Sequence, residues 1–86
     1  MTIATNRITL NQTRQQIVSA RNQSQRVCIH NDAGGRVYLG NESVTVDNGI
    51  HLDANDERNI TLNPNESLWG ISSASREVSF MIQIME

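Results

Sequence analysis

The residues that could serve as a nucleophile and a base are few and lie in one segment. Cys28 and His30 are two positions apart in a run of strand-forming residues, so in an extended chain both side chains point to one face. Acyl transfer also needs an orienting group beside such a pair, and the pair alone does not supply one. Since Cys28 is the only cysteine and stands among strand formers, we interpret it as a small buried apolar residue. We predict that the protein is not an enzyme.

A second group of polar side chains has the chemistry to bind a cation. Four such residues fall within one short stretch: His51, Asp53, Asp56 and Glu57. The segment from Asp53 to Glu57 loosely resembles a calcium loop, whose oxygen ligands alternate along the chain, but it lacks the glycine of the sharp turn and a correctly spaced glutamate. A charged loop of this kind is more often simply solvated. We expect no metal and no cofactor, although an ion in this loop stays an open alternative.

Aromatic residues offer a third kind of chemistry. Exposed aromatics would provide a surface for carbohydrate, and the candidates are Tyr38 and Trp69. Both stand in strand-like runs of Val, Leu and Ile, where an aromatic residue most often packs in the core, so we favour core positions for both. Three aromatics and a net charge of −2 also argue against a nucleic-acid partner.

Short strands must position these residues. From Arg26 onward, strand-like runs alternate with turn residues, and two hairpins are predicted. Gly34 and Gly35 separate the first two runs, and Asn48-Gly49 separates Val44–Val46 from Ile50–Leu52; both pairs suit tight turns. Strands about 8–12 residues apart are typical of a sandwich or barrel. No run keeps a helical period, so we predict an all-β fold, a small antiparallel β-sandwich or jelly-roll-like barrel with little or no helix.

The last predicted strand is apolar on both faces. Val78, Phe80, Ile82 and Ile84 alternate toward one face, and Met81 and Met85 fall on the other. A strand of this kind is usually covered on both sides. Two alternatives remain open for the methionine face, namely another subunit or the chain's own N-terminal arm.

The pattern changes near residue 26, which divides the chain into a polar N-terminal arm with short strands, residues 1–25, and a β-sandwich or barrel core, residues 26–86. We expect the arm to be either weakly packed or an element that pairs with a neighbouring subunit. The predicted interface with another subunit or a partner therefore combines arm residues with the methionines: Arg7, Ile8, Leu10, Arg14, Ile17, Arg21, Met81 and Met85.

Size and composition favour self-association. The chain has 86 residues, too few cysteines for an internal disulfide, and no Cys/His cluster for zinc. Small folds without such staples often gain stability by forming oligomers, so we expect a homo-oligomer. No apolar stretch approaches the ~18 residues of a membrane span, and the first residues lack the pattern of a signal peptide. We expect no membrane partner and assembly in a cytoplasm-like compartment.

The order of the motifs adds a resemblance to a family. Arg26-Val-x-Ile-x-Asn31 is followed by Val37-Tyr-Leu-Gly40, then Asn48-Gly-Ile-x-Leu52, then Leu68-Trp-Gly-Ile-Ser72. This succession, over roughly residues 13–84, resembles a group of small virion structural proteins of tailed bacteriophages. The glutamine- and asparagine-rich start departs from the family pattern, which has a short Pro-containing segment before the Arg-x-Val strand.

The resemblance implies a capsid decoration (cement) protein, with the major capsid protein as partner. It implies a homotrimer on the outer surface of a phage head, assembled in the host cytoplasm. The alternative is a tail- or spike-associated binding module that recognises a host-surface glycan, which requires solvent-exposed aromatics.

Overall fold

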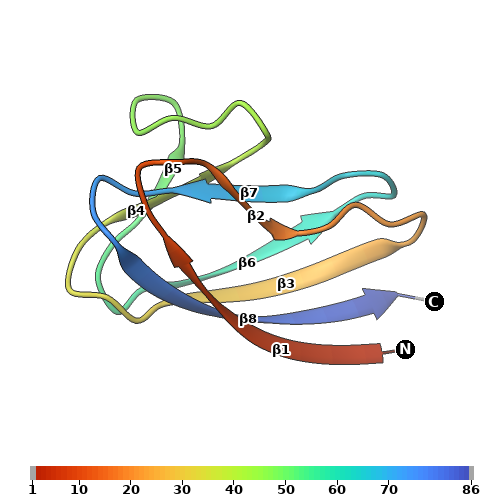
Figure 1. Ribbon diagram of the computed structural model, residues 1–86. Helices are drawn as coiled ribbons and strands as arrows, with labels where there is room; N and C mark the ends of the chain where they lie inside the picture. The colour runs from red at the N-terminus through yellow and green to blue at the C-terminus, as the bar shows by residue number, and fades with distance from the viewer. Residues whose placement is uncertain (1, 86) are drawn as a thin grey trace.

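Strands are the only regular elements in the computed structural model, which describes residues 2–85 (Figure 1). In chain order they are β1 (Thr2–Leu10), β2 (Gln15–Val18), β3 (Ser24–Asn31), β4 (Val37–Gly40), β5 (Ile50–Leu52), β6 (Glu57–Leu62), β7 (Leu68–Ile71) and β8 (Arg76–Met85). No helix long and apolar enough to cross a bilayer occurs in this part of the chain. The prediction of an all-β fold is confirmed.

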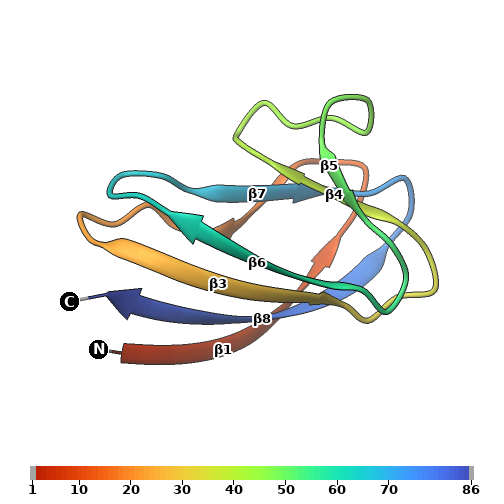
Figure 2. The same cartoon turned by 180° about the vertical axis from the view of Figure 1, so that it is seen from behind.

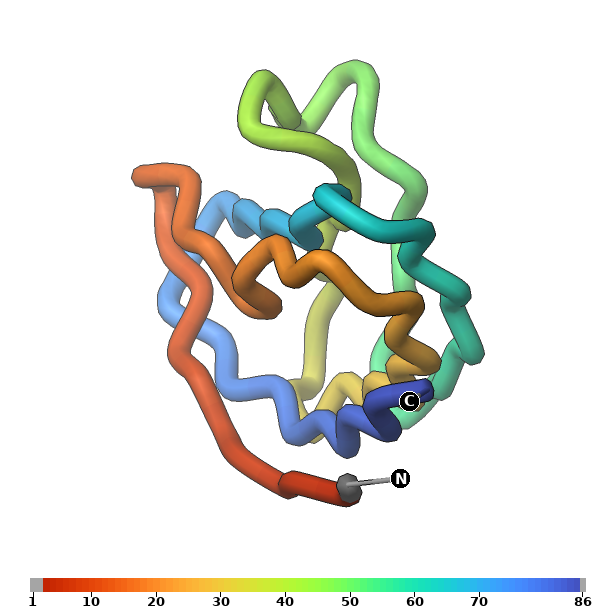
Figure 3. Tube along the Cα trace, turned by 90° about the vertical axis from the view of Figure 1, so that its right-hand side faces the viewer, coloured from red at the N-terminus to blue at the C-terminus, as the bar shows by residue number. Residues whose placement is uncertain are grey.

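The strands form two four-stranded antiparallel sheets that face each other (Figures 1 and 2). The first sheet has the strand order β1-β8-β3-β6, and the second sheet has the strand order β2-β7-β4-β5. This interleaving of an eight-stranded chain between two sheets is the arrangement of a jelly roll. The beginning of β1 and the end of β8 lie at the same end of the sandwich, where Thr2 is in register with Ile84 (Figure 3).

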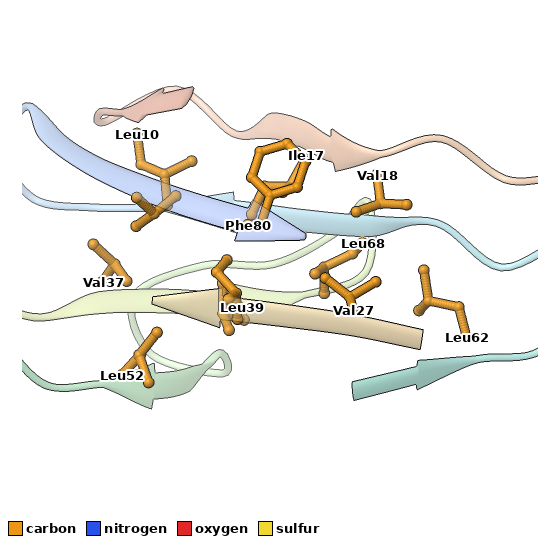
Figure 4. Close-up of a cluster of buried hydrophobic side chains, with 12 residues drawn as sticks. Leu10, Ile17, Val18, Val27, Val37, Leu39, Leu52, Leu62, Leu68 and Phe80 are labelled. Atoms are coloured by element: carbon orange, nitrogen blue, oxygen red, sulfur yellow. The ribbon is translucent and has the colours of Figure 1, made fainter. Parts of the chain in front are cut away.

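The core lies between the two sheets and follows the period-2 alternation of the strands. On β3 the inward positions are Val27 and Ile29, both fully buried, and on β8 they include Val78 and Phe80. Figure 4 shows Val27 and Phe80 among the side chains of the opposite sheet, and Ile29 and Val78 belong to the same cluster. The expected inner face of the last strand is confirmed.

Residues 2–18 are part of the sandwich rather than a separate arm. β1 pairs with β8 along its whole length, and β2 pairs with β7, so each forms an edge of one sheet. Leu10, Ile17 and Val18 are buried in the core. A Cβ atom added at Gly70 of β7 would lie 2.8 Å from side-chain atoms of both Leu10 and Ile17, which shows how closely this segment packs. The expectation that the N-terminal arm is weakly packed is therefore wrong for residues 2–18.

The predicted strand over Val44–Val46 does not form. Residues 41–49 make a loop that projects from the second sheet, so β5 contains only three residues (Figure 1). The Thr45 hydroxyl accepts hydrogen bonds from the backbone N–H groups of Asp47 and Asn48, and the Asn48 side chain accepts one from the Thr45 N–H. These side chains satisfy the backbone locally, in competition with a strand ladder.

A buried asparagine connects the two sheets at one end of the sandwich. Asn31, the last residue of β3, is fully buried. Its Nδ2 donates to the carbonyl oxygens of Gly35, Leu52 and Asp53, at 2.7, 3.0 and 3.2 Å, and its Oδ1 accepts from the Ala33 N–H at 3.0 Å. One side chain thereby joins the β3–β4 turn to the end of β5.

Candidate interaction surfaces

Cys28 and His30 share the outer face of the first sheet, as their spacing predicts, but each has a different partner. The Cys28 thiol lies 3.7 Å from Glu57 Oε2, and His30 Nδ1 lies 2.7 Å from Asp32 Oδ1. Partial burial, and then the Glu57 carboxylate, raise the pKa of the Cys28 thiol. A raised pKa disfavours the thiolate that a nucleophilic cysteine needs. Because Cys28 is half-buried on an outer face, its interpretation as a core residue is corrected.

In the loop that resembles a calcium site, the first carboxylate forms an ion pair with Arg36 and also contacts His51. Asp53 Oδ1 accepts from Arg36 Nε at 2.8 Å and lies 3.2 Å from His51 Nδ1. Asn55 adopts a left-handed conformation at φ 63°, and the Asp56 N–H donates to the Asp53 carbonyl. Among residues 2–85, no three His, Cys, Asp or Glu side chains gather as metal ligands would.

The hydrogen bonds of Asp53 and Asp32 predict how the stability of the fold responds to acid. The hydrogen bond from Arg36 lowers the pKa of Asp53 below its ordinary value of 3.8, and the hydrogen bond with His30 does the same for Asp32. A carboxylate whose pKa is lower in the folded state contributes stability above its unfolded pKa and loses it as the pH falls through the folded pKa. We expect the melting temperature to fall less between about pH 4 and about pH 2 in Asp53→Asn than in the wild type, measured by circular dichroism.

The matched control for this prediction is Asp47→Asn, because Asp47 is exposed and makes no ion pair with any residue that the structure describes. This variant should follow the acid response of the wild type. An Asp53→Asn curve that also superposes on the wild type would show that the Arg36 pair contributes nothing.

β1 is the longest edge strand of the two sheets, and one of its backbone N–H groups, that of Arg7, is bonded by the Asn6 side chain. Its register with β8 is continuous from Thr2 to Leu10, and it contains no proline, lysine or bulge. The other three edge strands are shorter: β5 has three residues, β2 has four with an irregular register, and β6 has six. Ile3 of β1 is 61% exposed. A long, regular edge is a template for pairing with another strand.

The predicted interface residues divide into two groups. Leu10 and Ile17 are 0% and 7% exposed and belong to the core, so their assignment to an interface is wrong: the sandwich needs their side chains to fill the space beside Gly70. Ile8 is half-buried and packs against the same core, so its assignment to an interface is also wrong. Five residues are exposed or half-buried and remain predicted interface residues: Arg7, Arg14, Arg21, Met81 and Met85.

The methionine face of β8 is not covered by the chain's own N-terminal segment. β1 lies beside β8 in the sheet, not over it, and leaves Met81 43% exposed. Met81 pairs in register with Thr5 and Cys28, and together with Arg7 they line a shallow hollow of about 610 Å³ on this outer face. The alternative in which the arm covers the methionines is therefore wrong.

The outer face of the second sheet carries the two aromatics that the sequence assigned to the core. Leu68 and Gly70 of β7 point inward and are buried, whereas Trp69 points outward and is half-buried. Tyr38 of β4 is half-buried between two buried neighbours in the same way. In such short apolar runs, both faces look alike in sequence, so nothing in the pattern indicated which residues face outward.

Trp69 forms the floor of a groove between two loops. Gln12, Thr13 and Arg14 of the β1–β2 turn lie on one side, and Glu42, Ser43 and Thr45 of the β4–β5 loop lie on the other. The groove has a volume of about 710 Å³ and its floor is completed by Ile71. This groove was missed at the sequence level because its two walls are 30 residues apart in the chain.

Comparisons with known proteins identify a similar fold but no family. No family model matches the chain, and no curated protein matches it. A solved structure from the endospore appendages of Bacillus, which are described as a novel family of disulfide-linked pili, superposes with a TM-score of 0.55. The match covers 99% of this chain and 90% of that one at 11% sequence identity, so the likeness concerns the fold alone.

Proposed function

We propose that this protein is a structural subunit that assembles by adding the β1 edge of one copy to the sheet of another. The observation that supports this most is the β1 edge, nine residues long and regular in register, in a protein whose other edge strands have six residues or fewer. Pairing would satisfy the outward backbone groups of β1 and cover Ile3.

The neighbouring edge that fits β1 best is β6 of a second copy. Strand directions alternate across β1-β8-β3-β6, so β6 and β1 run in opposite directions, and a head-to-tail copy adds another antiparallel pair. Arg7 of β1 and Glu57 of β6 lie on the same outer face and carry opposite charges. Head-to-tail contacts close into rings or extend into filaments, whereas pairing of two β1 strands would stop at a dimer.

A closed trimer on the outside of a phage head is the setting that we propose for this assembly. The order of motifs from Arg26 to Ser72 supports it through the resemblance to phage virion proteins. The similar fold of the Bacillus pilus protein supports the broader class, because that protein also belongs to a structural assembly. In this setting the protein stabilises the shell by binding the assembled state of the major capsid protein.

The test of the assembly is a change of mass caused by one edge substitution. We expect the wild type at about 100 μM to have the mass of three chains by light scattering, and Ile3→Lys to be monomeric, since a lysine on an edge opposes strand addition. Thr61→Lys, on the exposed face of β6, should have the same effect.

The matched control is Ile50→Lys, because Ile50 is 56% exposed on β5, an edge of the other sheet. This variant should keep the mass of the wild type. A monomeric wild type, or a dimer that survives Thr61→Lys, would overturn the head-to-tail trimer. The virion role is tested by the copy number and position of the protein in particles: many copies on the head support decoration, and a few at the tail contradict it.

A further inference from the structure

The groove over Trp69 lies outside the proposed assembly interface and is large enough for a small ligand. It lies on the outer face of the second sheet, whereas β1, β6 and the methionine face belong to the first sheet. Its volume of about 710 Å³ lies within the range of small-molecule sites, roughly 300–1,000 Å³.

The indole of Trp69 offers the groove a carbon surface rather than a hydrogen-bond donor. Its Nε1 already donates to the Oγ of Ser67, the residue just before β7, at 3.0 Å. Across the sheet, Trp69 is in register with Gln16 on one side and Gly40 on the other. Since Gly40 has no side chain, Val44 packs over it and extends the apolar floor beside the indole.

The walls carry groups of both charges and several neutral polar groups. Arg14 and Glu42 are exposed on opposite walls, and neither forms an ion pair with another residue of the described chain. Arg14 can only donate hydrogen bonds, and Glu42 can only accept them when ionised. A ligand that satisfies both must present donors as well as acceptors.

Both walls are held in place before any ligand binds. In the β4–β5 loop, Asn41 accepts the backbone N–H groups of Ser43 and Val44 through its side chain and its carbonyl, and the Thr45 carbonyl accepts the Gly49 N–H. In the β1–β2 turn, the Asn11 side chain accepts the Thr13 N–H. Preformed walls reduce the ordering cost of binding.

We infer that this groove binds a neutral pyranose sugar through stacking on Trp69. A pyranose has a flat face of C–H groups for the indole and a rim of hydroxyls that both donate and accept, which matches Glu42 on one wall and Arg14 on the other. An anionic ligand that paired with Arg14 would be repelled by Glu42 in the same groove, and a purely apolar ligand would make no hydrogen bond with either wall. Because the groove lies on the second sheet, the proposed sugar site does not depend on assembly through the edges of the first sheet.

The experiment is an NMR titration of the ¹⁵N-labelled protein with three neutral tetrasaccharides: cellotetraose, maltotetraose and chitotetraose. We expect at least one of them to shift the Trp69 indole resonance and the backbone amides of Thr13 and Ser43, with a dissociation constant of about 1 mM, typical of a shallow site. Trp69→Ala should raise that constant at least about tenfold, and Trp69→Phe, which keeps an aromatic face, should raise it less.

Three further variants keep the result interpretable if Trp69→Ala folds poorly. Arg14→Gln and Glu42→Gln alter exposed side chains, and each should weaken binding about threefold without lowering the melting temperature. Tyr38→Ala is the matched control, because Tyr38 is half-buried on the same outer face but does not line the groove; it should bind like the wild type.

Two outcomes would overturn the inference. The first is the absence of shifts with all three sugars at about 10 mM, where a site of millimolar affinity is mostly occupied. The second is a stronger response of the same resonances to adenosine monophosphate, which would identify an aromatic anion as the ligand. Ile3→Lys should leave sugar binding intact, so failure of the sugar site and failure of the assembly are read from separate measurements.

Discussion

Asn31→Ala is expected to lower the free energy of unfolding by about 3 kcal/mol. The substitution removes four hydrogen bonds and leaves the carbonyls of Gly35, Leu52 and Asp53 without this donor. Buried polar groups that lose a partner cost about 1–3 kcal/mol each, less where water can reach them. In a domain whose total stability is about 5–10 kcal/mol, the midpoint of urea unfolding should fall markedly.

Asn31→Asp separates hydrogen bonding from packing. It keeps the size of the side chain and the acceptor for the Ala33 N–H, but directs an oxygen toward three carbonyl oxygens. We expect a loss at neutral pH at least as large as that of Asn31→Ala. Asn59→Ala, at an exposed position of β6, is the matched control and should change stability by no more than about 0.5 kcal/mol. Equal midpoints for Asn31→Ala and Asn59→Ala would contradict the role of Asn31 as a tie between the sheets.

Leu10→Ala is expected to destabilise the fold by about 3 kcal/mol, within the range of leucine truncations in well-packed cores. Leu10 is 0% exposed at the end of β1 and fills the space between β1 and Gly70 of β7. The measurement is chemical denaturation at low micromolar concentration, so that assembly does not contribute to the apparent stability.

Ile3→Ala is the control on the same strand, since Ile3 is 61% exposed and its truncation should cost no more than about 0.5 kcal/mol. A loss below about 1 kcal/mol for Leu10→Ala would mean that β1 is dispensable for folding. If the expected loss is found, deletion of residues 1–12 will unfold the domain rather than test an interface. Single substitutions on β1 are therefore the informative way to probe assembly.

The sequence alone determined most of the local structure. The Gly34-Gly35 pair placed the connection after β3, because glycine is common in turns. That connection crosses to the other sheet, so the hairpin predicted there is wrong. The strict alternation of Val78, Phe80, Ile82 and Ile84 predicted the inner face of β8, because a strand directs successive side chains to opposite faces. The all-β fold class followed from these two patterns together.

Only the tertiary structure decided which faces are covered. Alternation predicts which residues share a face but not what lies against that face, so Leu10 and Ile17 looked like interface residues although β7 packs on them. For the same reason, Tyr38 and Trp69 looked like core residues although their neighbours are the ones that point inward. The hydrogen-bond partners of Asn31 come from segments far apart in the chain, and so do the walls of the Trp69 groove. Only the packing of the two sheets brings these segments together.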